Sequence, residues 1–425
     1  MNSRERVARA LSHQEPDRVP LDLGGSATTG MNVSSVYLLR QALQLDPPGT
    51  PVKVIEPFQM LGEIAPDLQT ALGVDVAPLS GPLTFFGFRS EDWKPWTTFD
   101  ATPVLVPGAF NTQPDENGDI LMFPEGDRSV PPSGRMPAGG FYFDAIVRQE
   151  PLDEAALDVE DNLEEFGPVS EGDLAYFASQ ADWLWRETDR AIVGNFGGTS
   201  FGDIALVPAT QLKHPRGIRD IAEWYMSTIA RHDYVYRIFE RQCEIALANL
   251  RSVFEAVGNR ISVIFVSGTD FGMQTGPFIG PATYRELYQP FHKQINGWIH
   301  QNTTWKTFIH SCGSVIALLP DFIESGFDVL NPVQLSATGM DPKVLKERFG
   351  DQIVFWGGGI DTQQVLPFGT PDEVRAQVRE RIATLGANGG FVFNTIHNVQ
   401  AGTPVANLQA LYSSVQEFGR YPLNR

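Results

Sequence analysis

The sequence is poor in cysteine and in positive charge. Only two cysteines, Cys243 and Cys312, occur among 425 residues, so we expect no disulfide framework, and a reducing compartment suits the chain. Lysine and arginine number 32 against 51 aspartates and glutamates, which gives a formal net charge of −19. Nucleic acids and anionic membranes both bind basic surfaces, so the composition argues against either as a partner.

Long apolar runs are also missing. No stretch approaches the ~20 apolar residues that a membrane span needs. The first residues, Met-Asn-Ser-Arg-Glu-Arg, are not followed by the apolar core of a signal peptide. Hydrophobic residues still make up 42% of the chain, which is enough for a large core. We therefore predict a globular, cytoplasmic protein.

Short apolar segments alternate with helical patterns along the chain. Alternation of this kind predicts a parallel sheet with right-handed crossovers. There are eight strand candidates, which is the number that closes a (β/α)₈ TIM barrel. The alternative is an open doubly wound sheet, but the sequence contains no dinucleotide-binding fingerprint to support it. The predicted strands lie near residues 19–23, 75–79, 191–196, 261–266, 304–309, 328–330, 353–356 and 390–394. Helices are expected over residues 3–11, 170–189, 218–257, 281–301, 315–324, 371–385 and 403–417.

Residues 81–150 have a different texture, dense in aromatic residues, proline and glycine. The sequence Asp-Glu-Asn-Gly-Asp at 115–119 is typical of a hairpin turn between short strands. We interpret this part as an antiparallel β-rich insertion that forms a lid or a contact surface, with a small separate domain as the alternative. Residues 1–80 would begin the barrel, with a polar and helical stretch between the glycine pair at 24–25 and about residue 72. Residues 151–425 would complete it with an active site at its C-terminal face.

The segment 308–314, Phe-Ile-His-Ser-Cys-Gly-Ser, is the main candidate for a functional site. It places His310 and Cys312 at the carboxyl end of a predicted strand, and imidazole nitrogen and thiolate sulfur are ligands that zinc prefers. A lone His-x-Cys pair is a weak signal, because buried cysteines usually pack as small hydrophobic residues. In a barrel all strand ends face one pocket. His397, after the last strand, then becomes a third ligand.

The same pocket would collect further polar residues. Three protein ligands leave a tetrahedral zinc one open position, as catalytic sites require. Asp270 could act as a base, anchor the substrate or support His310. Without a metal, Asp22 or Asp270 could transfer protons with His397 orienting a substrate, as a decarboxylase needs. The candidate catalytic residues at strand ends are Asp22, Asn195, Asp270 and Gln334, and Asp361 would lie in the same pocket.

Four segments resemble the uroporphyrinogen decarboxylase-like superfamily: residues 4–20, 310–314, 355–361 and 397–407. The closer similarity is to its methyltransferase branch, which includes the coenzyme M methyltransferases of methanogens and the chloromethane- and methoxy-utilising corrinoid systems. The resemblance covers most of the chain, least clearly residues 81–190. It implies a (β/α)₈ barrel, a homodimer, a small methylated compound or folate as substrate, and a corrinoid (cobalamin) carried by a partner protein as methyl carrier.

The resemblance also implies a zinc ion held by His-x-Cys and a distant cysteine. His310 and Cys312 match this pattern directly. The distant cysteine stands six residues before Thr-Pro in the family, and Thr403-Pro404 puts that position at His397. The site therefore has an imidazole where the family has a thiolate, which makes it less electron-rich and a weaker activator of a thiol such as coenzyme M or homocysteine.

The resemblance leaves two principal hypotheses. True uroporphyrinogen decarboxylases carry an arginine-rich segment after the first strand, whereas residues 21–27 here contain no arginine. The leading hypothesis is a zinc-dependent methyltransferase in which His310, Cys312 and His397 hold the metal. The alternative is a metal-independent decarboxylase or lyase acting on a carboxylated substrate. A barrel that binds a corrinoid or another ligand without catalysis is the third class.

Overall fold

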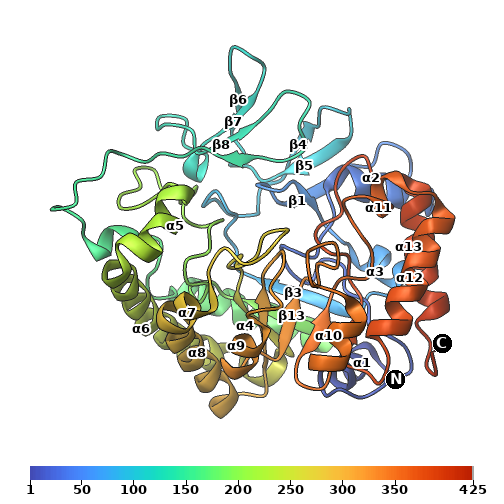
Figure 1. The fold of residues 1–425 in the computed structure, drawn as a ribbon. Coiled ribbons are helices and arrows are strands. Elements are labelled where there is room, and N and C mark those ends of the chain that lie inside the picture. The colour runs from blue at the N-terminus through green and yellow to red at the C-terminus, as the bar shows by residue number, and fades with distance from the viewer. Residues whose placement is uncertain (424–425) are drawn as a thin grey trace.

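Seven parallel strands form one curved sheet at the centre of the computed structural model, which describes residues 1–423 (Figure 1). Their order in the sheet is β15-β14-β13-β12-β11-β10-β3, so neighbours in sequence are neighbours in space once the insertion is left out. The strands are β3 (Val76–Ser80), β10 (Ala191–Asn195), β11 (Val263–Ser267), β12 (Lys306–His310), β13 (Val329–Asn331), β14 (Val354–Trp356) and β15 (Phe391–Val392).

A short segment around Leu21 closes the sheet into a barrel. Leu21 forms a parallel bridge with Phe393, just after β15. The Asp22 N–H donates to the Phe393 carbonyl at 2.8 Å, and on the other side the Asp75 N–H donates to the Leu21 carbonyl at 2.8 Å. Pro20 has no N–H to donate, which limits this segment to a single bridge. The predicted (β/α)₈ barrel is confirmed.

Helices cover the outside of the barrel (Figure 1). The main ones are α1 (Ser3–Leu11), α2 (Val33–Ala42), α3 (Pro66–Leu72), α4 (Glu171–Glu187), α5 (Ile221–Ala230), α6 (His232–Val257), α8 (Gln289–Asn302), α10 (Pro342–Phe349), α12 (Pro371–Leu385) and α13 (Val405–Phe418). Shorter ones are α7 (Pro281–Thr283), α9 (Leu319–Glu324) and α11 (Val365–Phe368), and a π-helical turn joins α7 to α8.

Two predicted helices differ from the structure. The helix expected over 218–257 is divided at Arg231, whose φ of −127° and ψ of 41° lie outside the helical region. The helix expected from residue 315 begins only at Leu319. Before it, the Ser314 hydroxyl donates to the Thr338 carbonyl at 2.6 Å, and the Ser314 N–H donates to the Met273 carbonyl at 2.8 Å. Both groups of Ser314 therefore bond to neighbouring loops, and the helix begins only after this residue is fixed.

Aromatic residues fill the barrel below the site. Phe265 and Phe308 stack with ring centroids 5.4 Å apart, and Phe308 meets Trp356 edge to face at 5.6 Å. Phe308 and His310 are two residues apart on β12, so their side chains share one face of the strand. His310 therefore stands above a packed aromatic layer at the C-terminal end of the barrel.

The insertion consists of two small sheets. One is antiparallel, with strands β6 (Gln113–Pro114), β7 (Ile120–Met122), β8 (Gly134–Met136) and β9 (Asp144–Ala145). The predicted turn joins β6 to β7, and the Asp115 carboxylate accepts the N–H groups of Asn117 and Asp119 within it. The antiparallel insertion is thus confirmed.

The second sheet also contains two strands that precede the insertion in sequence. Its order is β2-β1-β5-β4, with β1 (Val52–Glu56), β2 (Leu61–Gly62), β4 (Lys94–Thr97) and β5 (Pro103–Val106). The polar and helical stretch expected up to about residue 72 contains α2 and α3, but β1 and β2 interrupt it, and Val-Lys-Val-Ile-Glu in β1 pairs in parallel with β5. The division of the chain into three parts at residues 81 and 151 stays a prediction. β1 belongs to the first part and pairs with β5 of the insertion.

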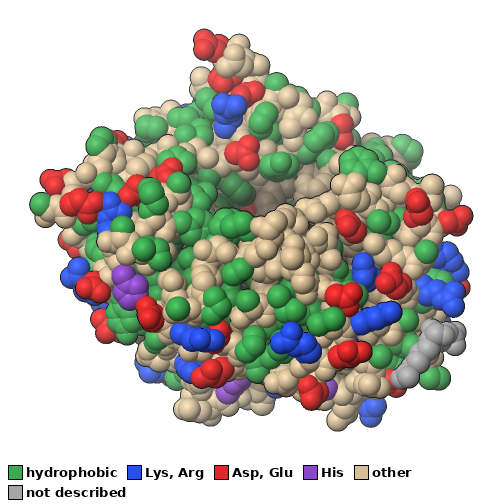
Figure 2. All heavy atoms as spheres, viewed as in Figure 1, with side chains coloured by type: hydrophobic (Ala, Val, Ile, Leu, Met, Phe, Trp, Pro, Cys, Tyr) green, Lys and Arg blue, Asp and Glu red, His purple; other side chains and the backbone are tan. Residues whose placement is uncertain are grey.

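The insertion lies over the C-terminal end of the barrel. The Thr210 hydroxyl, after β10, donates to the Phe85 carbonyl at 2.7 Å. The Asn398 amide, after β15, donates to the Gln59 side-chain oxygen at 2.7 Å. In Figure 1 the two small sheets stand together above the barrel, and Figure 2 shows a hollow between them and the barrel face. No helix within residues 1–423 is long and apolar enough to cross a membrane.

Candidate metal centre

Three predicted ligands come together at the C-terminal end of the barrel. His310 ends β12, Cys312 follows in the next turn, and His397 lies after β15. Their ligand atoms all lie within 4.8 Å of one another, and His310 Nε2 is 3.5 Å from Cys312 Sγ. Tetrahedral zinc holds such atoms roughly 3.3–3.8 Å apart. The donor set and its spacing therefore fit zinc after side-chain movements of about 1 Å.

A hydrogen-bonded chain orients His310. Asn331, at the end of β13, donates its amide N–H to the Trp356 carbonyl at 2.9 Å. The amide oxygen of Asn331 then faces His310 Nδ1 at 2.6 Å and must accept a hydrogen bond from it. Nδ1 therefore carries the hydrogen, and the lone pair of Nε2 is free for a metal.

Neighbouring strands clamp the turn that carries Cys312. The Cys312 N–H donates to Asp270 Oδ1 at 2.6 Å, and the Gly313 N–H donates to the Gln334 side-chain oxygen at 2.7 Å. Gly313 has a φ of +85°, and a Cβ there would stand 2.4 Å from the carbonyl carbon of Gly272. Glycine after the cysteine is thus required by backbone packing, and the turn holds the sulfur in one place.

The protonation states suit a cation. Burial lowers the pKa of both His310 and His397 to about 4, so both imidazoles are neutral ligands at neutral pH. Burial, and then the nearby Asp270, raise the pKa of the Cys312 thiol. Burial likewise raises the pKa of Asp270. A divalent cation would reverse this trend, because a coordinating thiol loses its proton.

The remaining predicted residues have other partners. Asp22 is buried in the barrel wall and accepts the Trp356 indole N–H at 2.7 Å and the Gly25 N–H at 2.9 Å. Burial raises its pKa to about 6. The Asn195 side chain accepts the Gly197 N–H at 3.3 Å in the glycine-rich turn. Asp361 accepts the N–H groups of the two residues 363 and 364.

These contacts separate the predicted residues into groups. Asp270 and Gln334 hold the backbone of the ligand turn itself. Asp22 is joined to His310 only through Trp356 and Asn331. Asn195 and Asp361 bond within the turns after β10 and β14. Catalytic roles for Asp22, Asn195, Asp270 and Gln334 stay predictions.

Sequence reasoning missed two residues of the site. Asn331 and Trp356 form the support of His310. Asn331 had a usable signal, since a polar residue directly ends a buried apolar strand next to the His-x-Cys strand. Trp356 had none, because its partners Asp22 and Asn331 are far away in sequence.

Replacing Asn331 with leucine should weaken zinc binding by about 10–100-fold, because His310 loses the partner that orients it. The loss of two buried hydrogen bonds should also lower the free energy of unfolding by about 1–3 kcal/mol. Asn407→Leu is the control, since the Asn407 amide is equally buried and donates to two carbonyls, of Leu366 and Gly369. Zinc titration should separate the two variants, whereas chemical unfolding should not. Equal zinc affinity in both would contradict the role of Asn331.

The fold and the site together define a TIM-barrel protein with a candidate metal centre at the C-terminal face of the barrel. The sequence profile of the uroporphyrinogen decarboxylase (URO-D) family matches residues 156–418, which is more than half of the chain. The chain belongs to this family, as the resemblance predicted.

A comparison of structures extends the likeness to the whole chain. A methyltransferase from Methanosarcina mazei superposes with a TM-score of 0.56 over 98% of this chain and 99% of its own, at 16% sequence identity. At this level of identity the likeness shows the shared fold. No functionally curated protein matches the sequence significantly.

Proposed function

We propose that the protein is a zinc-dependent methyltransferase that moves a methyl group between a small methylated compound, or folate, and a corrinoid carried by a partner protein. The observation that carries this proposal is the convergence of His310, Cys312 and His397 with their ligand atoms within 4.8 Å. Membership of the URO-D family and the shared fold with a methyltransferase support it.

Each residue of the site has a role in this proposal. His310, Cys312 and His397 hold the zinc, which when bound supplies a Lewis acid at its fourth position. Asn331 fixes the tautomer of His310. Asp270 holds the Cys312 backbone and balances the positive charge. With Asn195, it also orients the substrate that enters from the hollow below the insertion (Figure 2).

The ligand set favours activation of the methyl donor. One thiolate and two neutral imidazoles leave zinc with a net charge of about +1, whereas two thiolates and one imidazole would neutralise it. A more positive centre attracts an oxygen lone pair more strongly and makes a bound thiolate less nucleophilic. The imidazole at position 397 therefore supports an ether or hydroxyl oxygen at the metal more than a thiol acceptor.

The decarboxylase alternative has one observation in its favour. Asp22 has a pKa of about 6, which suits general acid–base chemistry near neutral pH. Against it, residues 21–27, after the first strand segment, contain no arginine that could pair with the carboxylates of a carboxylated substrate.

The purified protein should contain near-stoichiometric zinc by mass spectrometry and should exchange methyl groups with methylcobalamin. A chelator should abolish the exchange, and added zinc should restore it. Absence of metal after zinc is supplied would refute the proposal. Carbon dioxide released from candidate acids, insensitive to chelator, would establish the decarboxylase instead. Tight cobalamin binding without turnover would indicate a non-catalytic binding protein.

A further inference from the structure

The imidazole of His397, unlike that of His310, forms no hydrogen bond within residues 1–423. Asn331 orients the ring of His310, whereas the ring of His397 packs edge to face against His310 with the centroids 5.5 Å apart. The His397 carbonyl accepts the Thr395 hydroxyl at 2.5 Å, which is a contact within its own loop. The place of the third ligand therefore depends on what holds the backbone of this loop.

Asn398, the next residue, holds that backbone with a side chain that is 1% exposed. Its amide oxygen accepts the Gly30 N–H at 2.6 Å. Its amide nitrogen donates to the Ala27 carbonyl at 2.8 Å and to the Gln59 side-chain oxygen at 2.7 Å, so both amide hydrogens are used. A carboxylate at this position would have no N–H to donate, and an apolar side chain would leave all three buried partners unpaired. Asn398 therefore ties the loop that carries His397 to two other segments.

Gln59 connects Asn398 to the insertion. It lies in the turn between β1 and β2, and β1 pairs with β5 of the insertion. The carbonyl of its neighbour Phe58 accepts the Phe143 N–H at 2.8 Å, and the Phe58 ring lies 4.8 Å from the ring of Phe85. A side-chain hydrogen bond, from Asn398 to Gln59, thus joins the insertion to the loop of the third ligand.

Asn32 forms a second connection of the same kind. Its amide nitrogen donates to the carbonyl of Phe141 in the insertion at 3.0 Å. Its backbone N–H donates at 2.8 Å to the carbonyl of Val399, two residues after His397. The insertion therefore reaches the His397 loop on both sides of Asn398.

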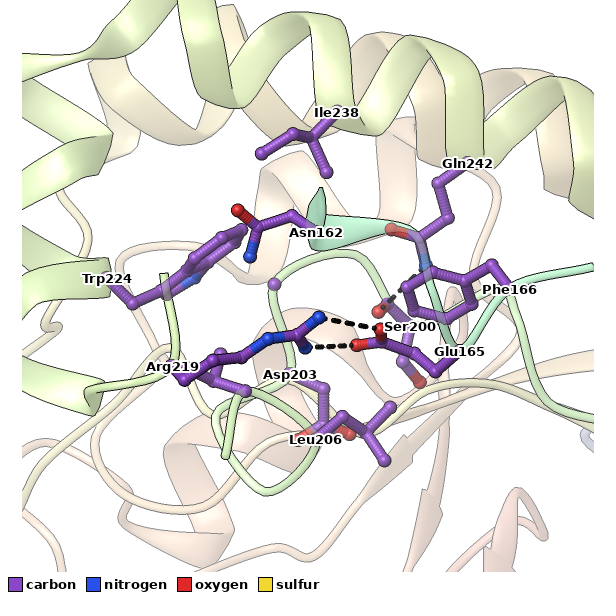
Figure 3. Close-up of a pocket in the computed structure, with 12 residues that line it drawn as sticks. Asn162, Glu165, Phe166, Ser200, Asp203, Leu206, Arg219, Trp224, Ile238 and Gln242 are labelled. Carbon is purple, nitrogen blue, oxygen red and sulfur yellow. Dashed lines mark hydrogen bonds and ion pairs between the residues drawn. The ribbon is translucent and has the colours of Figure 1, made fainter. Parts of the chain in front are cut away.

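Other attachments of the insertion reach the loop after β10. The Thr210 hydroxyl in that loop donates to a carbonyl of the insertion at 2.7 Å. The same loop, with Asp203, lines a small cavity of about 30 Å³, where Arg219 binds Glu165 through two hydrogen bonds of 2.8 and 3.1 Å (Figure 3). None of the three candidate ligands lines this cavity. These attachments fix the loop after β10, whereas Gln59 acts on the loop of a ligand.

We propose that Gln59 and Asn398 are positioning residues for His397, and that through them the insertion controls how firmly the site holds zinc. The inference rests on the proposed zinc-dependent function and adds a regulation of that site. His310 and Cys312 are held by barrel strands and the turns beside them, so a shift of the insertion displaces His397 alone. Coupling of this kind is reciprocal: if a shift of the insertion weakens zinc binding, then zinc binding must stabilise the insertion.

The first measurement is the zinc affinity of the full-length protein, by competition with a chromophoric chelator. Gln59→Met keeps the length of the side chain but removes its hydrogen bonds, and it should weaken zinc binding by about 10-fold. Asn398→Asp keeps the accepting oxygen but loses both donors, and it should weaken binding by about 10–100-fold. Gln416→Met is the matched control, since the Gln416 amide also donates to backbone carbonyls, those of Ala71 and Leu72 at 3.3 and 3.1 Å, beside the start of β3. Its zinc affinity should equal that of the wild type.

Hydrogen exchange separates positioning from a purely structural role. In the wild type, zinc should slow exchange of the N–H groups of Gln59 and Phe143, which bond to Glu56 and Phe58, by about 10-fold, the same factor as the loss of affinity. In Gln59→Met this difference between zinc-loaded and zinc-free protein should disappear. A purely structural role of Gln59 would lower protection equally with and without zinc, and that result would overturn the inference.

The outcomes also separate the inference from the proposed function. Wild-type zinc affinity in Gln59→Met and Asn398→Asp would overturn the inference and leave the zinc site standing. If circular dichroism shows that Asn398→Asp does not fold, the milder Gln59→Met decides alone. A wild type that binds no zinc when zinc is supplied would refute the proposed function, and the inference with it.

Discussion

Replacing Cys312 with alanine is expected to abolish zinc binding and methyl transfer together. Zinc binding in four-ligand protein sites is worth about 10–16 kcal/mol, so each ligand contributes roughly 2.5–4 kcal/mol, and losing the only thiolate should weaken affinity by roughly 10²–10³-fold. The chain offers a matched control in Cys243, which is buried in α6 away from the site. Cys243→Ala should keep its zinc and its activity. Metal content by mass spectrometry and methyl exchange with methylcobalamin measure both effects.

The two histidines extend this experiment. His310→Ala and His397→Ala should each lose zinc as well. If His397→Ala keeps its zinc while Cys312→Ala loses it, the metal site is supported but His397 is not its third ligand. Asp270 is then the first candidate for that ligand, because it already contacts the Cys312 backbone. Zinc kept in Cys312→Ala would contradict the site as a whole.

Replacing Asp75 with alanine is expected to cost about 3–5 kcal/mol of folding free energy, the largest effect on stability that we predict. Asp75 has no exposed surface and accepts hydrogen bonds from Arg6 at 2.6 Å, from Arg18 at 2.7 and 2.9 Å, and from the Leu21 N–H at 2.9 Å. Its removal leaves two guanidinium groups poorly compensated. It also loosens the contact between the first strand segment and β3, where the barrel closes.

Asp17→Ala is the control for this prediction. Asp17 also pairs with Arg6, at 2.7 Å, but its side chain is 43% exposed, so its loss should cost only about 0–1 kcal/mol. Chemical unfolding at neutral pH measures the difference between the two variants. Folded Asp75→Ala protein should still bind zinc, because the ligands lie at the opposite end of the strands. Similar midpoints of unfolding for both variants would show that Asp75 does not hold the barrel closed.

Local patterns in the sequence were enough for most of the barrel. Each predicted strand is a short apolar run followed by a glycine or a polar residue, and burial on both faces of a parallel strand produces that pattern. The helix predicted over 371–385 has the bounds of α12, because Thr370 and Glu373 form a capping box and Pro371 suits the first turn. The exception, β1, alternates apolar and polar residues only briefly, and its pairing with β5 skips nearly fifty residues of chain.

The sequence by itself determined the chemistry available to the site, because ligand type is a property of each residue. His310, Cys312 and His397 follow from their position after strands and from the rule that strand ends in a barrel face one pocket. Only the tertiary structure decided how those side chains are held. The tautomer of His310 depends on Asn331 and Trp356, and the raised pKa of Asp203 depends on burial and on Asp270. Such properties arise from contacts between distant segments, which no local pattern of residues records.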